Sequence, residues 1–396
     1  MSKIYIDLPA LSQFSNGTKC IKALRDYLVL CGFNVISLSR ETQMSKIKAF
    51  FFRKKIFDYK NNQFLNATKN DWLITCDTTS LPLLEIARKK GLNIAWWQLA
   101  PYNFLGNSQF PLPGEYSLPF SSYCDPSANE FYYYQPSVDK YWAEALKVSS
   151  DIEQTIKPSI CFYTGKGRLT KLPELIRKLC KNYELQLITR QFPSSRKEYF
   201  NLLNESKALI SFDEMSQTNL EAASLGLPVF IVNSIFPEES INKFNIKEYK
   251  ERVTRSPEVF YEMLCHSKRK LPKLKKSYLE SFNNESFKKF SLLIKDKGFF
   301  KNVTKSSLAN FENHSKVLKK KNLICPFFLW GQSFGIVLAS TYLTNLKNKR
   351  KYKMIVYLIY LMDEIGKILY KTKILKIFIL FYNICDILNS KYFPKV

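Results

Sequence analysis

This sequence of 396 residues has almost no histidine and no closely spaced pair of cysteines. It contains only His266 and His314, and its nine cysteines include no C-x-x-C pair. This pattern fits neither a zinc site nor a disulfide framework, so it favours a reducing compartment. The N-terminus, MSKIYIDLPAL, reads directly as a strand and lacks the long apolar core of a signal peptide. We therefore expect a cytoplasmic protein.

Acidic residues are scarce, and the imbalance of charge is concentrated in one part of the chain. The sequence has 34 Asp and Glu against 60 Lys and Arg, a net charge of +26. Residues 251–396 hold 29 Lys and Arg against 10 Asp and Glu, and so carry +19 of this charge. A basic tail is typical of nucleic-acid or anionic membrane partners, with general solubility charge as the alternative. No stacking motif accompanies the charge, so we expect no nucleic acid.

The rest of the chain has the pattern of an α/β protein. Hydrophobic residues make up 46% of the whole sequence, which argues against disorder, and the length suits two domains and an extra segment. Short apolar runs bounded by Gly and Pro alternate with helical patterns, as in parallel sheets. The predicted strands are Lys3–Leu8, Asn34–Leu38, Asp71–Thr75, Asn93–Trp97, Glu130–Tyr134, Ser159–Tyr163, Leu185–Thr189, Ala208–Phe212 and Val229–Val232. We predict two Rossmann-like domains, residues 1–147 and 158–294, followed by a helical extension over 295–396.

The stretch ALISFDEMSQTNLEAASLGLPVFIV, residues 208–232, carries the clearest functional signal. It predicts a strand, a loop rich in acids and hydroxyls, a short helix and a buried strand. Ligands of such sheets lie beyond the carboxyl ends of the strands, where helix N-termini present free N–H groups. The polar residues at that place are Asp213, Glu214, Ser216, Gln217, Thr218 and Asn219, and Glu221 lies one turn inside the helix.

Asp213 and Glu221 bracket seven residues of this stretch. A carboxylate beside a pair of ring hydroxyls accepts two strong hydrogen bonds, and a helix N-terminus holds a diphosphate. The spacing therefore predicts a nucleotide-sugar site. The alternative is that Thr218-x-x-Glu221 forms a capping box and that Asp213 merely ends a strand.

A second loop, Thr164-Gly165-Lys166-Gly167-Arg168, follows the predicted strand Ser159–Tyr163. Its glycines let a backbone approach a ligand, and Lys166 and Arg168 supply positive charge for a diphosphate. It is not a Walker loop, because the four-residue spacer and the Lys-Ser/Thr ending are missing. Arg190, at the end of the next predicted strand, is a further candidate for donor binding. A plain basic turn is the alternative.

The segment FDEMSQTNLEAASLGLPVFIV resembles the donor-binding segment of GT-B-type glycosyltransferases, of the family 1/4-like kind that makes bacterial polysaccharide or lipopolysaccharide. The resemblance implies that two Rossmann-like domains face each other, that Glu221 binds the nucleotide ribose, and that the Asp213 region faces the donor sugar. Asp213 stands where many members have Glu. The basic loop likewise resembles the first strand-loop of the donor domain.

The implied function is transfer of a sugar from a nucleotide-activated donor to a glycan or lipid-linked acceptor in cell-surface polysaccharide synthesis. One alternative is a GT-B-fold sugar-nucleotide epimerase, which would want histidines near the donor. Another is a non-catalytic basic membrane-binding module. No D-x-D motif lies near a strand end, so we expect neither a metal nor a cofactor besides the nucleotide-sugar substrate.

Acceptor-side and catalytic candidates lie in the first half of the chain. Its opening resembles the start of the GT-B acceptor domain, whose loop with Asn16 and Gly17 approaches the reaction centre. Trp96 and Trp97 lead into a loop rich in aromatics, which suits stacking on an acceptor sugar; packed loop aromatics are the alternative. Asp77 follows a predicted strand and is the candidate general base if the reaction inverts.

The extension over residues 295–396 has three apolar runs among lysines: Cys325–Leu343, Met354–Met362 and Ile374–Leu388. Interleaved basic and apolar residues fit helices that lie in a membrane interface. A span by Cys325–Leu343 and a bundle packed on the core are the alternatives. An anionic surface at the inner face of the cytoplasmic membrane is thus a candidate partner, because it would present a lipid-linked acceptor.

Overall fold

The computed structural model describes residues 2–8, 16–39, 64, 66–76, 81–101, 110–121, 124–132, 140–148, 158–189, 193, 195–234, 251–266, 276–300, 302–321, 342, 343, 346, 354, 357 and 361. The chain forms two compact units. The first unit is Met1–Ser137 with Lys275–Asn322, and the second unit is Val138–Leu274 with Leu323–Val396.

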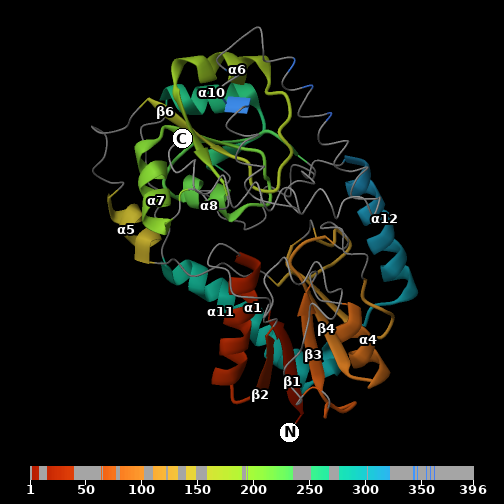
Figure 1. Cartoon of the computed structure of the whole chain (residues 1–396). Coiled ribbons are helices and arrows are strands. Elements are labelled where there is room, and N and C mark those ends of the chain that lie inside the picture. The colour runs from red at the N-terminus through yellow and green to blue at the C-terminus, as the bar shows by residue number, and fades with distance from the viewer. Residues whose placement is uncertain are drawn as a thin grey trace, which may run out of the picture. The chain divides into compact units, whose positions relative to one another are not determined.

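The first unit is built on five parallel strands in the order β2-β1-β3-β4-β5 (Figure 1). The strands are β1 (Lys3–Leu8), β2 (Asn34–Ser39), β3 (Trp72–Cys76), β4 (Asn93–Gln98) and β5 (Tyr116–Pro119). The central strands β1, β3 and β4 are mostly apolar and buried, as expected for a sheet whose two faces are both covered by helices. The α4 helix (Leu81–Lys89) packs on one face together with Val303 and Phe311. The α1 helix (Asn16–Leu30) and the α11 helix (Lys276–Lys295) lie side by side, with the Tyr27 and Phe287 rings 5.3 Å apart.

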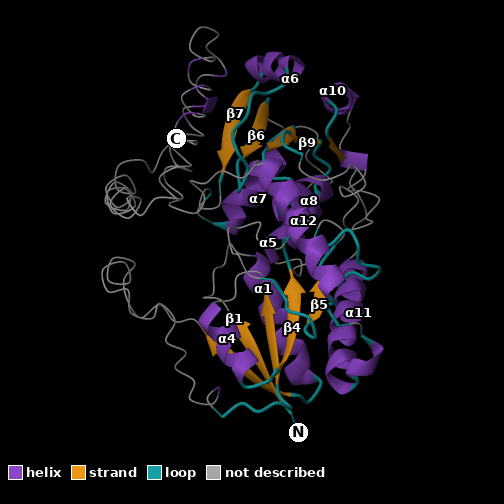
Figure 2. Ribbon diagram, turned by 90° about the vertical axis from the view of Figure 1, so that its right-hand side faces the viewer, coloured by secondary structure: helices purple, strands orange, loops and turns teal. Residues whose placement is uncertain are grey.

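The second unit has five parallel strands in the order β10-β9-β8-β6-β7, among them the β6, β7 and β9 strands labelled in Figure 2. They are β6 (Ser159–Tyr163), β7 (Glu184–Ile188), β8 (Ala208–Ser211), β9 (Val229–Ile231) and β10 (Val253–Thr254). The α6 helix (Glu174–Leu179), continued by a 3-10 turn over Cys180–Asn182, and the α10 helix (Pro257–His266) share one core with the sheet. The α7 helix (Arg196–Glu205) contacts β6 from the other face, where the Cys161 side chain meets Ser206. The α8 helix (Gln217–Ser224) contacts β8, and the α5 helix (Lys140–Val148) packs on α7.

Both sheets have the same topology. Counted from the first strand of each unit, the order is 2-1-3-4-5, a doubly wound order typical of nucleotide-binding folds. At one point of such a sheet, between its first and third strands, the strand order reverses, so the connections from these two strands run to opposite sides. This switch point lies between β1 and β3 in the first unit and between β6 and β8 in the second. The predicted α/β class with two Rossmann-like units is therefore confirmed.

Two elements of the first unit differ from the prediction. Residues 130–132 of the predicted strand Glu130–Tyr134 are not a strand, and the edge strand is β5, inside the predicted aromatic loop. Tyr132 still reaches the sheet, because its N–H donates to the carbonyl of Pro119. The α1 helix begins at Asn16, so Asn16 and Gly17 open a helix rather than lie in the predicted loop.

The boundary that we predicted at residue 294 differs from the division in the structure. The α11 helix was expected to close the second domain, but it belongs to the first unit. The physical reason is aromatic packing: the Phe290 ring lies 5.2 Å from Trp97 and 5.7 Å from Tyr132. A 3-10 turn (Lys297–Phe299) and the α12 helix (Lys305–Lys321) follow in the same unit. The start of the predicted extension is therefore part of the core of the first unit.

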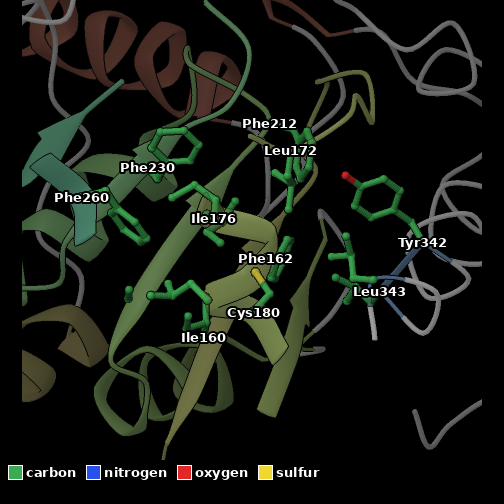
Figure 3. Packing of buried hydrophobic residues seen from close by; sticks show 14 of the residues in the cluster. Ile160, Phe162, Leu172, Ile176, Cys180, Phe212, Phe230, Phe260, Tyr342 and Leu343 are labelled. Carbon is green, nitrogen blue, oxygen red and sulfur yellow. The ribbon is translucent and has the colours of Figure 1, made fainter. Parts of the chain in front are cut away.

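Further along the predicted extension, three residues pack into the second unit. Tyr342, Leu343 and Leu346 are buried in one cluster with residues of β6, β8 and α6. Figure 3 shows Tyr342 and Leu343 in this cluster. The Tyr342 hydroxyl donates to the Thr170 carbonyl over 2.6 Å. These contacts support the packed alternative at the end of Cys325–Leu343. Across the residues described above, no helix is long and apolar enough to cross a membrane. The run Ile374–Leu388 lies outside the described residues.

Candidate functional site

The switch point of the second unit brings together the two loops that the sequence analysis selected. Ser159–Tyr163 and Ala208–Ser211 pair in parallel, so the loops after β6 and β8 leave the same edge of the sheet. The Phe212 N–H donates to the Tyr163 carbonyl at 2.9 Å and extends this pairing past the strand ends. Ligands of doubly wound sheets bind at this position.

The side chain of Asp213 joins the two loops. Its Oδ2 accepts the backbone N–H of Lys166 at 2.9 Å, and its Oδ1 accepts that of Met215 at 3.2 Å. Both glycines of the first loop are needed for this approach. Gly165 has φ +49°, and an added Cβ there would overlap the Asp213 carboxylate. A Cβ on Gly167 would overlap the backbone carbonyl of Phe212. Asp213 thus sets the path of the basic loop, and Lys166 and Arg168 are half-buried on that loop.

Two buried asparagines fix the backbone around Asp213. The Asn219 Nδ2 donates to the carbonyls of Asp213 and Glu214, at 2.9 and 3.3 Å. The Asn233 Nδ2 donates to the Arg168 carbonyl at 2.5 Å, and its Oδ1 accepts the Thr170 hydroxyl at 2.6 Å. From the sequence, Asn219 was predicted only as one of the polar residues at this place, and Asn233 was not predicted, since neither residue has a charge or a diagnostic spacing.

The α8 helix begins beside these loops. Its N-cap is Ser216, whose Oγ accepts the N–H of Thr218 at 3.1 Å. The capping-box alternative for Thr218 and Glu221 is therefore wrong, because the cap lies two residues earlier and the Glu221 side chain bonds elsewhere. Glu214, the other predicted acid of the loop, forms an ion pair with Arg255. Glu214 and Thr218 are largely shielded from solvent, and Ser216 is half-buried.

Glu221 is buried, with 4% of its surface exposed, and three hydrogen bonds hold its carboxylate. Arg196 at the start of α7 donates from Nη2 to Oε1 at 2.8 Å and from Nη1 to Oε2 at 3.2 Å. The Tyr199 hydroxyl donates to Oε2 at 2.7 Å. Burial and the neighbouring Glu221 raise the pKa of Tyr199 well above its ordinary value, so this hydroxyl remains a neutral donor. Glu221 was predicted from the sequence, but its partners Arg196 and Tyr199 were not.

The remaining predicted residues lie elsewhere. Trp96 and Trp97 are 1% and 0% exposed, and their indole N–H groups donate to Glu115 and to the Tyr132 carbonyl. In this structure neither ring has an exposed face on which a sugar could stack. Trp96 and Trp97 are therefore packed aromatics, as the alternative prediction stated. Gly17 is half-buried in α1, with room for a Cβ at 3.6 Å from Leu99. Asp77 and Arg190 lie outside the described residues, as does the side chain of Asn16.

Within the described part of the chain, no three His, Cys, Asp or Glu side chains gather as they would around a metal ion. At the switch point, the described charges are the carboxylates of Asp213, Glu214 and Glu221 and the cations of Lys166, Arg168, Arg196 and Arg255. Arg255 and Arg196 pair with Glu214 and Glu221. Lys166 and Arg168 are half-buried and carry the positive charge of the basic loop itself, a charge that favours an anionic ligand.

No protein-family model matches the sequence, and neither does any curated protein. Among solved structures, an alpha-glucosyltransferase in complex with UDP and a 13-mer DNA is 13% identical, with a TM-score of 0.32, over 85% of this chain and 99% of that one. MurG of Acinetobacter baumannii is 10% identical, with a TM-score of 0.34, over 73% and 95% of the two chains. An ABC transporter solute-binding protein from Conexibacter woesei is 11% identical, with a TM-score of 0.24, over 83% and 99%. The fold is defined by the strand order of the two sheets, independently of this likeness.

Proposed function

We propose that this protein is a glycosyltransferase that uses a nucleotide-activated sugar. The observation that carries the proposal is the switch point between β6 and β8. There a basic glycine loop, the start of α8 and the buried carboxylate of Glu221 lie on one unit. A diphosphate is the natural ligand of a basic loop and a helix N-terminus, and a ribose hydroxyl is the natural ligand of a carboxylate.

In the proposed reaction, an acceptor hydroxyl attacks the anomeric carbon of the donor sugar. The bond from that carbon to the diphosphate oxygen breaks, and the nucleoside diphosphate leaves with the additional negative charge. Lys166 and Arg168 stabilise this charge, because preorganised cations act most strongly where charge develops. Arg190, which follows β7 in the sequence, is our further candidate for this role. A general base removes the proton of the acceptor if the reaction inverts, and Asp77 is our candidate for it.

A panel of nucleotide sugars, offered with glycan and lipid-linked acceptors and with or without a chelator, tests the activity and its metal requirement. Replacing both Lys166 and Arg168 by Met is expected to lower turnover by roughly 100-fold or more, as lost leaving-group stabilisation does. Lys171→Met with Lys178→Met removes the same charge near α6 and serves as the matched control. Wild-type turnover in the Lys166/Arg168 variant would contradict the assigned phosphate site.

A sugar-nucleotide epimerase is the alternative enzyme on the same fold. It would convert the donor without an acceptor and release an isomeric nucleotide sugar. Incubation of the donor alone, followed by separation of isomers, distinguishes the two activities. An isomer formed without an acceptor would replace the transferase proposal.

We further propose that the acceptor is lipid-linked and that the C-terminal segment docks on an anionic membrane. Met354, Tyr357 and Leu361 are helical, 60%, 68% and 44% exposed, and three or four residues apart. Such spacing places them on one helix face. Four basic residues precede them in the sequence, within 349–353, and a basic residue near an anionic surface adds about 1 kcal/mol.

Sedimentation with phosphatidylserine vesicles tests the docking in the full chain. Replacing Met354, Tyr357 and Leu361 together by Ser is expected to abolish pelleting at low salt. Val29, Leu30 and Val317 are exposed apolar residues of the first unit, and their replacement by Ser is the control. Wild-type protein that stays in solution at every salt concentration would remove the membrane proposal and leave the transferase proposal standing.

A further inference from the structure

The carboxylate of Glu221 is nearly saturated by contacts within the protein. A carboxylate has about four lone-pair sites. Arg196 and Tyr199 together fill both sites on Oε2 and one site on Oε1. Among the described residues, one acceptor position on Oε1 is left. The two-hydroxyl contact expected from the sequence would need two free acceptor positions.

The two donors are themselves held firmly in place. The Arg196 guanidinium lies over the ring of Phe200, 4.6 Å from its centroid, and 5.1 Å from that of Tyr199. Trp142 of α5 stacks on Phe200, with ring centroids 6.3 Å apart and an interplanar angle of 17°.

The same Trp142 also reaches α8. Its indole N–H donates to the Ser224 hydroxyl at 2.9 Å, and that hydroxyl donates to the Glu221 carbonyl at 2.7 Å. The contacts among α5, α7 and α8 therefore form a closed circuit around Glu221. A carboxylate so constrained cannot rotate without breaking several of these contacts.

We propose that Arg196 and Tyr199 are positioning residues that present one oxygen of Glu221 to a single ribose hydroxyl of the bound nucleotide. The inference rests on the proposed function, because it takes the ligand to be a nucleotide. It adds the recognition of one hydroxyl rather than two, and two residues that set this selectivity without touching the ligand.

The experiment uses the full chain and isothermal calorimetry with ADP, GDP, CDP and UDP, and then the 2′-deoxy and 3′-deoxy forms of the tightest binder. Loss of a hydrogen bond to a charged group costs about 10–100-fold in affinity. We expect one deoxy form to lose this factor and the other to remain within about threefold of the parent. Equal losses for both forms, or no loss for either, would overturn the inference.

Variants then test the positioning role. Arg196→Met and Tyr199→Phe are expected to bring the affinities of the two deoxy forms to within about threefold of each other, since the carboxylate is no longer held. Lys197→Met, an exposed cation on the same helix turn, should keep the wild-type ratio. A merely structural role would weaken all three ligands equally and leave the ratio unchanged, which would refute the assignment. Tyr199→Phe decides the question alone if Arg196→Met does not fold.

The inference and the proposed function fail in different ways. If none of the four nucleoside diphosphates binds the wild-type protein at millimolar concentration, both fall. If a nucleotide binds but the deoxy forms show no asymmetry, only the single-hydroxyl inference falls.

Discussion

Tyr342 offers a direct test of where the C-terminal segment packs. Its side chain is 1% exposed, its ring lies edge-on to Phe212 at 5.8 Å, and its hydroxyl donates to Thr170. If these contacts hold the segment in the core of the second unit, truncation of Tyr342 must destabilise that unit. A membrane-spanning role for the segment predicts no such effect.

The structure sets the size of the expected loss. Removing the hydroxyl alone with Tyr342→Phe gives up one neutral hydrogen bond, a net cost of about 1 kcal/mol. Tyr342→Ala also removes the buried ring and leaves a cavity, which costs about 3–5 kcal/mol for a large aromatic residue. Tyr357→Ala is the matched control, because that ring is 68% exposed and should change stability by less than about 0.5 kcal/mol.

Hydrogen exchange reports this effect separately for the two units. Amides of β6 and β8 that exchange by opening of the second unit should exchange roughly 10³-fold faster in Tyr342→Ala, the equivalent of about 4 kcal/mol. Amides of β1 and β3 in the same sample serve as the internal reference. If β6 and β8 are as well protected in Tyr342→Ala as in Tyr357→Ala, Tyr342 is not part of this core and the packing argument is refuted.

Two further predictions concern single contacts. Gly167→Ala is expected to destabilise the second unit by about 1–3 kcal/mol and to weaken nucleotide binding, since its Cβ would overlap the Phe212 carbonyl. Thermal unfolding checks it against Gly17→Ala, which has ordinary space in a helix and should be neutral or stabilising by up to about 1 kcal/mol. Burial raises the pKa of Asp71, but hydrogen bonds from Lys3 and Thr68 lower it more, so the net pKa is below the usual value. The stability from Asp71 is therefore present above the unfolded pKa of about 3.9 and is lost as the pH falls through the lower folded value. Asp71→Asn should flatten this part of the acid-unfolding curve, and an unchanged curve would show that Asp71 contributes nothing there.

The sequence predicted the strands and the loop after β8 because these features are local. Apolar runs of parallel strands are continuous, and Gly and Pro mark their ends. The edge strand β5 was missed because its four residues, Tyr116–Pro119, include a proline and follow a Gly-containing turn. Trp96 and Trp97 look alike in sequence whether they pack or project, and only their burial distinguishes the two cases.

Contacts between residues far apart in sequence could not be predicted, because no local pattern identifies the partner. Arg196 and Glu221 are 25 residues apart, and 60 Lys and Arg residues could have supplied a partner for this acid. Likewise, the apolar stripe of α11 shows that the helix packs on something, but not on which sheet. That choice depends on aromatic contacts with Trp97 and Tyr132 that no periodic pattern encodes.

The division of the chain leads to a last prediction. Each unit is completed by residues far downstream: Phe287, Phe290, Val303 and Phe311 in the first, and Tyr342, Leu343 and Leu346 in the second. Burial of one such side chain contributes about 1.5–3 kcal/mol to the free energy of unfolding. The four side chains of the first unit therefore contribute roughly 6–12 kcal/mol, as an upper estimate. This is comparable to the whole stability of a domain, about 5–15 kcal/mol.

Fragments 1–147 and 158–294 should therefore expose apolar surface, bind a hydrophobic dye and unfold without a cooperative urea transition. A sharp transition in either fragment would show that its core is closed without these residues. Until then, the membrane and nucleotide experiments call for point variants in the full chain, because deleting 296–396 removes core side chains from both units.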